Sequence, residues 1–264
     1  MSRTERAQTS TDMLQLLGLT YDKNSSTINL FQRFEETVAE TFDLPEANAI
    51  RSAMQVMSQA HIEQKRKDGG LYIEHPIDVA LRVIEILEHP NADAVIAAIF
   101  HDTIEDQSKK FLELSDIEID PDVPNEVQAL QTLRERYGEE VGRLVSGLSN
   151  PDFREELAQQ GITPDKPEYS KRKRELYAEH VAKIIQDPTL CIIKYSDFSQ
   201  NGLDLSGLPN GEEKKDLCRK YRPVIDLFRS RISDETSPLD TNKQPSMLLE
   251  LDESAEYIDE YLAA

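Results

Sequence analysis

The sequence has little of several features, and each absence narrows the class of protein. Only two of its 264 residues are cysteines, and Cys191 and Cys218 both stand in apolar or helical surroundings. We therefore expect reduced packing residues rather than a disulfide. No apolar run approaches the roughly 20 residues that a membrane-spanning helix requires. The N-terminal stretch MSRTERAQTSTDMLQLLGLT lacks the hydrophobic segment of a signal peptide. These absences predict a cytoplasmic protein without a membrane segment.

Positive charge is also scarce. The chain has 30 Lys and Arg residues against 50 Asp and Glu residues, for a formal net charge of −20. Nucleic acids and anionic membranes bind broad basic surfaces, so this balance argues against both partners. An acidic protein can still bind a small phosphorylated molecule where a few cations converge. We therefore expect a small-molecule partner, and the sequence leaves open whether the chain forms a homo-oligomer.

Composition and periodicity favour an all-α fold. Charged residues are 30% of the chain and hydrophobic residues 38%, as in soluble globular proteins. The first half contains no convincing alternation of the kind that strands show. We expect a single domain over 27–232, with an acidic insertion within about 107–170. A loosely attached arm would precede it over 1–26, and a linker with an acidic C-terminal helix would follow over 233–264.

Apolar residues recur at helical spacing along most of this length. The C-terminal segment SMLLELDESAEYIDEYL is also amphipathic, and could dock on this chain or on a partner. The expected helices cover 27–42, about 45–62, 75–87, 91–106, 125–144, 170–186, the start of 188–205, and 215–232.

The stretch AAIFHDTIED, residues 97–106, ends an apolar run in one imidazole and three carboxylates. A continuous helix would place Asp102 and Asp106 four residues apart on one face, with Glu105 three residues from Asp102. Burying such charges without partners is unfavourable. The stretch must therefore run out into solvent or surround a cation.

Four residues are candidate metal ligands: His75, His101, Asp102 and Asp197. Taken singly, each could be a packing, capping or surface residue. A helix beginning at His75 and a second helix returning antiparallel would bring His75 close to His101. Mixed imidazole and carboxylate ligation suits Mn²⁺, Fe²⁺ or Zn²⁺. Glu105 and Asp106 would then position or deprotonate a water that such an ion acidifies.

Together these segments resemble a known family. AHIEQKRKDGGLYIEHPIDVA and AAIFHDTIED are similar to the hydrolase domain of the RelA/SpoT stringent-response proteins, which belong to the HD phosphohydrolase superfamily. IIKYSDFSQNGLDL resembles the family's later segment, with an Asp and an Asn four residues on. The resemblance covers residues 46–106 closely and 171–232 less closely. The motifs that carry it are His61 with Gln64, Arg66-Lys67, Gly70, Tyr72-Ile73, His75-Pro76, His101-Asp102 and Glu105-Asp106.

The resemblance implies an HD-type helical bundle and a stand-alone small alarmone hydrolase. Such an enzyme removes the 3′-pyrophosphate of (p)ppGpp, giving GDP or GTP and pyrophosphate. By the resemblance, one Mn²⁺ would be bound by the four candidate ligands, and Glu105 and Asp106 would handle the attacking water. The resemblance implies that Arg66 and Asn201 contact the base and ribose, and that Tyr221 contacts the nucleotide. Lys67 would lie near the phosphates. Either Lys194 or one of the residues 171–174 would hold a phosphate.

The chain departs from the family's pattern near the later Asp. Phe198 stands where the family has a basic residue, and Gln200 stands where it has His or Tyr. The region between Asp102 and Asp197 is also longer and more acidic. These differences leave other substrates open, such as (p)ppApp or the 2′-phosphate of NADPH. A non-catalytic domain that senses a nucleotide or binds a protein is the alternative outside the enzyme class.

Overall fold

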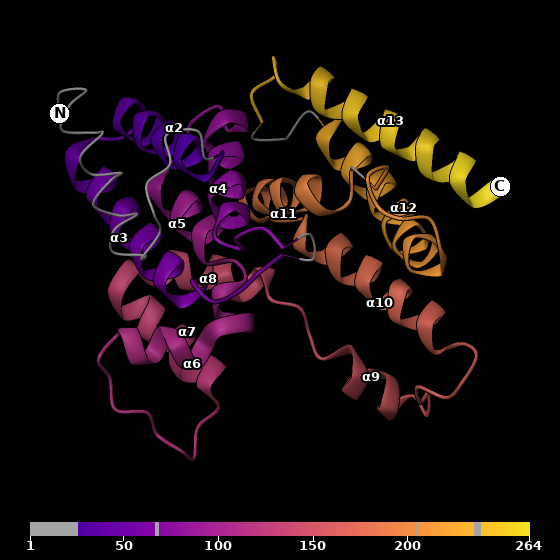
Figure 1. Ribbon diagram of the computed structural model, residues 1–264, viewed down its shortest axis with the longest axis horizontal. Helices are drawn as coiled ribbons and strands as arrows, with labels where there is room; N and C mark the ends of the chain where they lie inside the picture. The colour runs from indigo at the N-terminus through magenta and orange to yellow at the C-terminus, as the bar shows by residue number, and fades with distance from the viewer. Residues whose placement is uncertain (1–25, 67–68, 204, 235–238) are drawn as a thin grey trace. The chain divides into compact units, whose positions relative to one another are not determined.

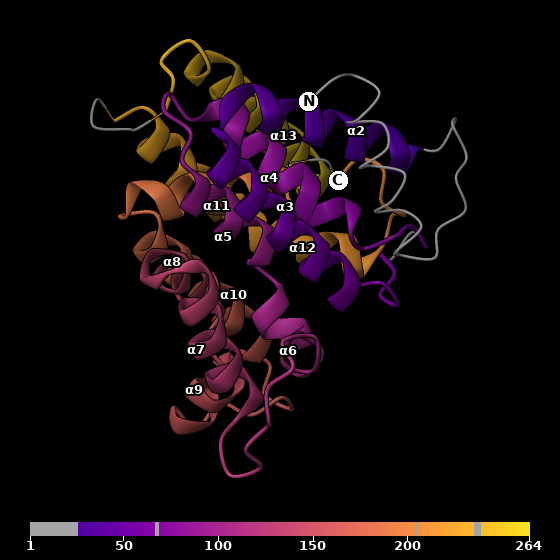
Figure 2. The same ribbon diagram turned by 90° about the vertical axis from the view of Figure 1, so that its left-hand side faces the viewer.

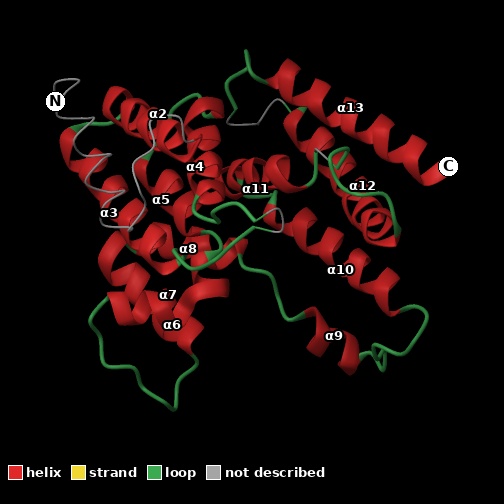
Figure 3. Ribbon diagram, in the orientation of Figure 1, coloured by secondary structure: helices red, strands yellow, loops and turns green. Residues whose placement is uncertain are grey.

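The structure is a computed structural model that describes residues 26–66, 69–203, 205–234 and 239–264. Within these ranges every regular element is a helix (Figure 3). Strand-like pairing there is limited to two isolated bridges, Lys65 with Leu71 and Leu87 with Leu239. The all-α fold expected from the sequence is therefore confirmed. None of the described helices is both long enough and apolar enough to cross a membrane.

The chain divides into two compact units, one reaching Glu85 and resuming over His89–Ser149, the other made of Ile86–Glu88 and Asn150–Ala264. Figures 1 and 2 label their helices. The first unit contains α2 (Ser26–Thr41), α3 (Leu44–Ala60), α4 (Glu74–Ile86), α5 (Ala92–Phe100), α6 (Thr103–Leu114), α7 (Asn125–Tyr137) and α8 (Glu139–Leu148). The second contains α9 (Phe153–Gln159), α10 (Tyr169–Ile184), α11 (Pro188–Asn201), α12 (Glu212–Ile232) and α13 (Gln244–Ala263).

The core of the first unit is built around α5. Its sequence, ADAVIAAIF, has no polar residue after Asp93, and every residue from Ala94 to Phe100 is buried. Both α3 and α8 pack against it. The last residue, Phe100, contacts Phe111 of α6 and Tyr137 of α7, with ring centroids 5.6 and 5.1 Å away. Because Phe100 is fixed by these contacts, the positions of the next residues, His101 and Asp102, are fixed as well.

The single helix expected over Asn91–Asp106 is wrong, because the structure has α5 and α6 there, with His101 and Asp102 between them. The Nδ1 atom of His101 lies 2.8 Å from the carbonyl oxygen of Ala98. A continuous helix would offer that carbonyl to the backbone N–H of Asp102. Helical spacing survives the break, since the backbone N–H of Asp106 still donates to the carbonyl of Asp102 at 2.8 Å.

The helix expected over Asn125–Leu144 is likewise two helices, α7 and α8, which meet at Gly138. Gly138 has a φ of 100°, a conformation that favours glycine because it has no Cβ. Its backbone N–H donates to the carbonyl of Arg134 at 2.9 Å and closes α7. The apolar spacing continues across this break, so periodicity alone predicts one continuous helix.

The C-terminal helix α13 docks on this chain, which decides between the two alternatives that the sequence left open. It packs along α12 of the same unit (Figure 1). Two ion pairs join the helices, Arg222 with Asp259 at 2.8 Å and Arg229 with Asp252. Its buried apolar face consists of Met247, Leu251, Ala255 and Ile258.

The segments expected to flank the domain are only partly described. Of the arm expected over 1–26, only Ser26 lies in a described range, and it begins α2. In the expected linker, Leu239 is buried and the backbone N–H of Asp240 donates to the carbonyl of Ile86 at 3.1 Å. The domain boundaries expected from the sequence stay a prediction.

Docking of α13 predicts different effects for two nearby leucines. Leu251 is fully buried, so Leu251→Ala should lower the free energy of unfolding by about 3 kcal/mol through lost burial and a cavity. Leu249 is 58% exposed, so Leu249→Ala should change it by less than about 0.5 kcal/mol. Urea denaturation followed by circular dichroism measures both values. Equal values for the two variants would contradict this packing.

Candidate metal centre

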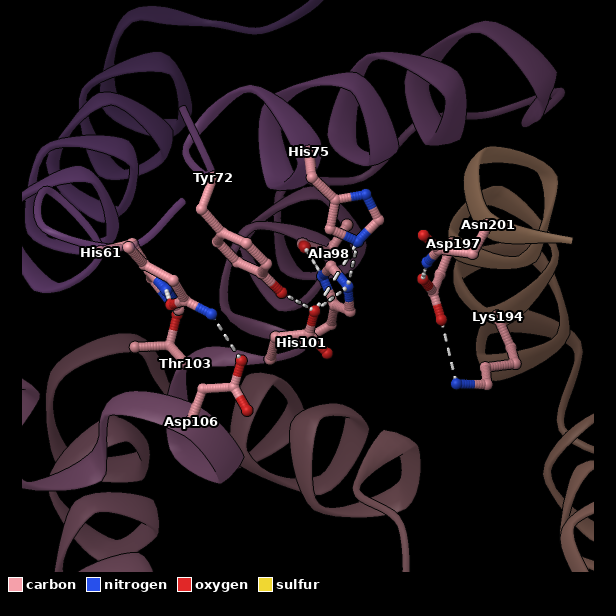
Figure 4. Close-up of polar contacts among 12 residues, drawn as sticks. His61, Tyr72, His75, Ala98, His101, Thr103, Asp106, Lys194, Asp197 and Asn201 are labelled. Atoms are coloured by element: carbon pink, nitrogen blue, oxygen red, sulfur yellow. Dashed lines mark hydrogen bonds and ion pairs between the residues drawn. The ribbon is translucent and has the colours of Figure 1, made fainter. Parts of the chain in front are cut away.

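Two histidines and one aspartate from three helix ends meet in the first unit (Figure 4). His75 lies in the first turn of α4, His101 follows α5, and Asp102 is the N-cap residue of α6. The two Nε2 atoms are 3.2 Å apart. The Oδ2 atom of Asp102 lies 3.6 Å from Nε2 of His75 and 3.1 Å from Nε2 of His101. The structure thus brings together three of the four ligands expected from the sequence.

This donor set fits a divalent cation. Its three ligand atoms all lie within 4.8 Å of one another. Because Nδ1 of His101 lies against the Ala98 carbonyl, we assign the ring proton to Nδ1, and Nε2 presents its lone pair to the cluster. A single cation would use all three of these donors at once.

Tyr72 is a site residue to which the sequence assigned no role of its own. Its hydroxyl donates to the Oδ2 atom of Asp102. Its ring stacks on that of His61, with centroids 4.9 Å apart and planes inclined by 21°. Its backbone N–H donates to the carbonyl of Gln64 at 3.2 Å, which closes the turn after α3. The signal in the sequence that could have identified Tyr72 as a site residue is its position three residues before His75.

A chain of hydrogen bonds leads from His61 to Asp106. The His61 ring lies 3.1 Å from the Thr103 hydroxyl through Nε2 and 2.6 Å from Oε1 of Gln64 through Nδ1. The amide nitrogen of Gln64 donates to Oδ2 of Asp106 at 3.1 Å. Gln107 also donates to Oε1 of Gln64, at 3.1 Å, but the network gives it no bond to Asp106. The carboxylate of Asp106 is therefore held by Gln64, which in turn is held by His61 at the end of α3.

His61 supports this network as a neutral ring. It is fully buried, and burial is the largest cause that lowers the pKa of its imidazole. The hydrogen bond to Gln64 and the charges of Asp102 and Asp106 act in the opposite direction and are smaller. A neutral ring whose Nδ1–H donates to Gln64 accepts the Thr103 hydroxyl at Nε2, so both ring nitrogens have partners.

Glu105 and Asp106 lie in the first turn of α6. Both are exposed, whereas the preceding Thr103 and Ile104 are buried. Carboxylates are favourable at this position because the N-terminus of a helix carries a partial positive charge. The pair therefore reaches solvent at the start of the helix that follows Asp102.

Arg66 lies in the turn between α3 and α4. Its carbonyl accepts the N–H of Gly69 and its N–H donates to the carbonyl of Gly70, both at 2.9 Å. Gly69 has a φ of 89°, which favours glycine there. Among the described residues the Arg66 guanidinium has no ion-pair partner, although it lies close enough to oppose the burial that raises the pKa of Asp78. Lys67, the expected phosphate-binding neighbour, lies outside the described residues.

The fourth expected ligand, Asp197, belongs to the second unit and lies on α11. Asn201 donates to its Oδ1 atom at 2.7 Å, and the ammonium of Lys194 donates to its Oδ2 atom at 3.0 Å (Figure 4). Lys194 and Asp197 are only 7% and 9% exposed. Both expected substrate-binding residues on this helix thus contact the carboxylate itself.

Phe198, the residue after this Asp, is a packing residue. The ring of Phe198 lies 5.5 Å from that of Tyr221 and 5.1 Å from that of Phe228. A Cβ at Gly202 would stand 2.3 Å from the Phe198 ring, so the glycine is needed for this packing. Phe198 is therefore part of an aromatic cluster between α11 and α12.

The remaining expected residues are in the second unit. Tyr221 is 9% exposed, and burial raises the pKa of its hydroxyl, which stays protonated. In the basic run at the start of α10, Lys171 and Arg172 pair with acidic residues of their own helix, and Arg174 pairs with Asp216 of α12. Most of this run is thus engaged in surface ion pairs.

Comparison with known proteins identifies the family. A family model described as HD domain matches residues 53–220. The guanosine-3′,5′-bis(diphosphate) 3′-pyrophosphohydrolase of Aquifex aeolicus is 30% identical over 59% of this chain and 17% of that protein. A probable GTP pyrophosphokinase of Mycobacterium leprae is 28% identical over 70% of this chain and 19% of its own. The bifunctional (p)ppGpp synthase/hydrolase SpoT of Escherichia coli is 25% identical over 77% of this chain and 24% of its own.

The chain thus spans a quarter or less of the length of these relatives. The matched region contains the whole His75, His101 and Asp102 cluster as well as Asp197. The resemblance seen in the sequence is confirmed: the chain belongs to the HD domain family and is related to the RelA/SpoT proteins.

Proposed function

We propose that the protein is a metal-dependent hydrolase that removes the 3′-pyrophosphate of (p)ppGpp. Water would add to the phosphorus bonded to the 3′ oxygen, that P–O bond would break, and the 3′ oxygen would take up a proton. The products are GDP or GTP and pyrophosphate. The observation that carries the proposal is the cluster of two buried histidines, His75 and His101, with Asp102, together with a carboxylate, Asp106, that a hydrogen bond from Gln64 holds in place. The names of the relatives supply the substrate.

The cluster would bind one divalent ion, for which Mn²⁺ is our proposal. Asp197 would complete the ligand set of His75, His101 and Asp102, as the family resemblance implies. When bound, such an ion acidifies a water molecule and neutralises charge on phosphate oxygens. Imidazole and carboxylate ligands suit Mn²⁺, Fe²⁺ and Zn²⁺ alike, so the choice among them depends on measurement.

Asp106 and Glu105 would accept the proton of the attacking water. Gln64 fixes one oxygen of Asp106 through its amide N–H, which leaves the other oxygen to meet water. Glu105, exposed and adjacent on the same helix turn, would assist it. Carboxylates are suitable bases when they are placed within hydrogen-bond reach of the proton that they take.

The substrate residues keep the roles that the resemblance implies, with one refinement. Arg66 would contact the base, Lys67 a phosphate, and Tyr221 the nucleotide. Lys194 and Asn201 both contact Asp197, so we propose that they also orient that carboxylate toward the ion. Asn201 would still reach the ribose.

The same fold acting on another nucleotide is the second candidate. Phe198 supports it, because an aromatic cluster stands where the family carries a cation, close to Asn201 and Tyr221. A change of this kind next to residues that contact the base or ribose alters which nucleotide is bound best. Adenine alarmones and NADPH are therefore part of the test below.

A substrate panel tests the activity. Wild-type protein with Mn²⁺ should release pyrophosphate from ppGpp faster than phosphate or pyrophosphate from ppApp or NADPH. Replacing Glu105 and Asp106 together by Ala should lower kcat at least about 100-fold, since general acid–base catalysis contributes this much. Glu113→Ala, which removes an exposed carboxylate from the last turn of the same helix, is the matched control and should leave kcat unchanged.

Two results of this panel would contradict the proposal. No turnover of any nucleotide by the wild type would exclude a hydrolase acting on this panel. Tight nucleotide binding without turnover, unchanged in the double variant, would favour the non-catalytic sensor instead.

Metal binding is tested with two histidines of the first unit. His101→Gln should weaken Mn²⁺ binding by more than about 100-fold, because loss of a ligand exceeds the roughly 10- to 100-fold effect of losing an outer hydrogen-bond partner. His89→Gln removes an exposed imidazole and should leave binding unchanged. Manganese retained after dialysis, measured by mass spectrometry, gives the stoichiometry. Equal retention by both variants would place the ion elsewhere.

The support of Asp106 by Gln64 predicts a selective loss of turnover. Gln64→Leu should lower kcat roughly 10- to 100-fold with KM unchanged, because Asp106 loses its hydrogen-bond donor. Gln107→Leu removes an amide that contacts Gln64 but has no bond to Asp106, and kcat should fall by less than about threefold. Steady-state kinetics with ppGpp measures both. A larger loss in the Gln107 variant would contradict this network.

A further inference from the structure

Lys220 holds its ammonium over the faces of two tyrosines in the second unit. Its Nζ atom lies 4.1 Å from the ring centroid of Tyr177 and 4.9 Å from that of Tyr221. The two rings meet edge to face, with centroids 6.3 Å apart. Tyr177 belongs to α10 and the other two residues to α12, and these helices pack side by side (Figure 1). The sequence assigned Lys220 no role.

Two positive and two negative groups act on this ammonium. Burial is the largest cause that lowers the pKa of Lys220, to about 8, and the charges of Lys194 and Lys173 lower it further. Asp197 and Asp216 oppose them. Both of these carboxylates are already engaged, Asp197 by Lys194 at 3.0 Å and Asp216 in the ion pair with α10.

Within the described ranges Lys220 itself has neither an ion pair nor a hydrogen bond. Attraction to aromatic faces offsets only part of the free-energy cost of taking an ammonium out of water. The free-energy cost of partly burying this ammonium is therefore not fully offset, and a bound anion would lower it.

A buried lysine of the same helix shows how the fold can satisfy an ammonium with hydrogen bonds, whereas Lys220 is only partly buried. Lys214 is 3% exposed and also lies over two rings, at 5.3 Å from Tyr257 and 4.8 Å from Tyr261. Unlike Lys220, it reaches three oxygens. These belong to Ser206 at 3.2 Å, Leu208 at 3.0 Å and Asn210 at 3.4 Å.

We propose that Lys220 binds a phosphate group of the nucleotide substrate, with Lys173 supplying a second positive charge there. The inference rests on the proposed function for its ligand class, a nucleoside polyphosphate. A phosphate suits the position better than a base, because the ammonium already covers the Tyr221 face on which a base could stack. Tyr177, from α10, is a positioning residue that holds the Lys220 side chain in place.

Binding without metal tests this inference apart from catalysis. Inorganic pyrophosphate is titrated calorimetrically into the full chain in EDTA. Lys220→Met should weaken its binding about tenfold, the loss expected for one charge-assisted hydrogen bond. Lys220→Arg should restore most of it. Lys215→Met, which removes the same charge from the same helix, is the matched control and should bind like wild type.

Kinetics with ppGpp and Mn²⁺ provides the second readout. Lys220→Met should raise KM about tenfold and change kcat by less than about threefold, with rescue of KM by Lys220→Arg. Unchanged KM and unchanged pyrophosphate binding in Lys220→Met would overturn the inference, whatever the wild type hydrolyses. If instead the wild type hydrolyses nothing but binds pyrophosphate through Lys220, the proposed function fails and the phosphate site stands.

Thermal unfolding guards against a purely structural effect. Because Lys220→Met removes a desolvated charge without breaking an ion pair, the Tm should stay within about 2 °C of wild type or rise. A fall of more than about 5 °C in both Lys220→Met and Lys220→Arg, together with lost binding, would assign Lys220 to the packing of α10 on α12 and overturn the proposal.

Discussion

Two imidazole nitrogens 3.2 Å apart, with a carboxylate oxygen 3.1 Å from one of them, concentrate electron pairs that a cation would stabilise. The first unit holds these atoms in place through its core. Helix α5 is buried from Ala94 to Phe100, so the residue after it, His101, has little freedom. Its ring proton is committed to the carbonyl of Ala98, which turns the other nitrogen toward His75 and Asp102. The apolar packing of α5, which contains no functional group, therefore fixes the geometry of the cluster.

The two units contain different chemical groups. In the first, Asp102 accepts the hydroxyl of Tyr72, whose ring stacks on His61, and His61 leads through Gln64 to Asp106. One connected network thus supports both a proposed metal ligand and the proposed base. The second unit supplies lysines on aromatic faces and near carboxylates, of which only some are paired. Such local convergence is how a chain with a net charge of −20 could bind a polyanion.

Much of this could be predicted from the sequence, because periodicity and motif spacing are local signals. The all-α fold, the helix after His75 and the pairing of Asp197 with Asn201 on one helical face depend on residues close in the chain. What the sequence could not show depends on contacts made in space. The break between α5 and α6 follows from a side chain that takes a backbone carbonyl, and the split at Gly138 follows from a backbone angle. The place of the Lys220 ammonium requires a ring from another helix. Periodicity indicates which face of a helix a residue occupies, but it does not indicate which residues of other helices contact it.

A crystal structure of the protein grown with Mn²⁺, with anomalous data collected at the manganese edge, tests the metal centre most directly. We expect one anomalous peak at coordination distance from the Nε2 atoms of His75 and His101 and from carboxylate oxygens of Asp102 and Asp197. A peak held by other residues, or a cluster of His75, His101 and Asp102 that remains without manganese at millimolar concentration, would contradict the proposal.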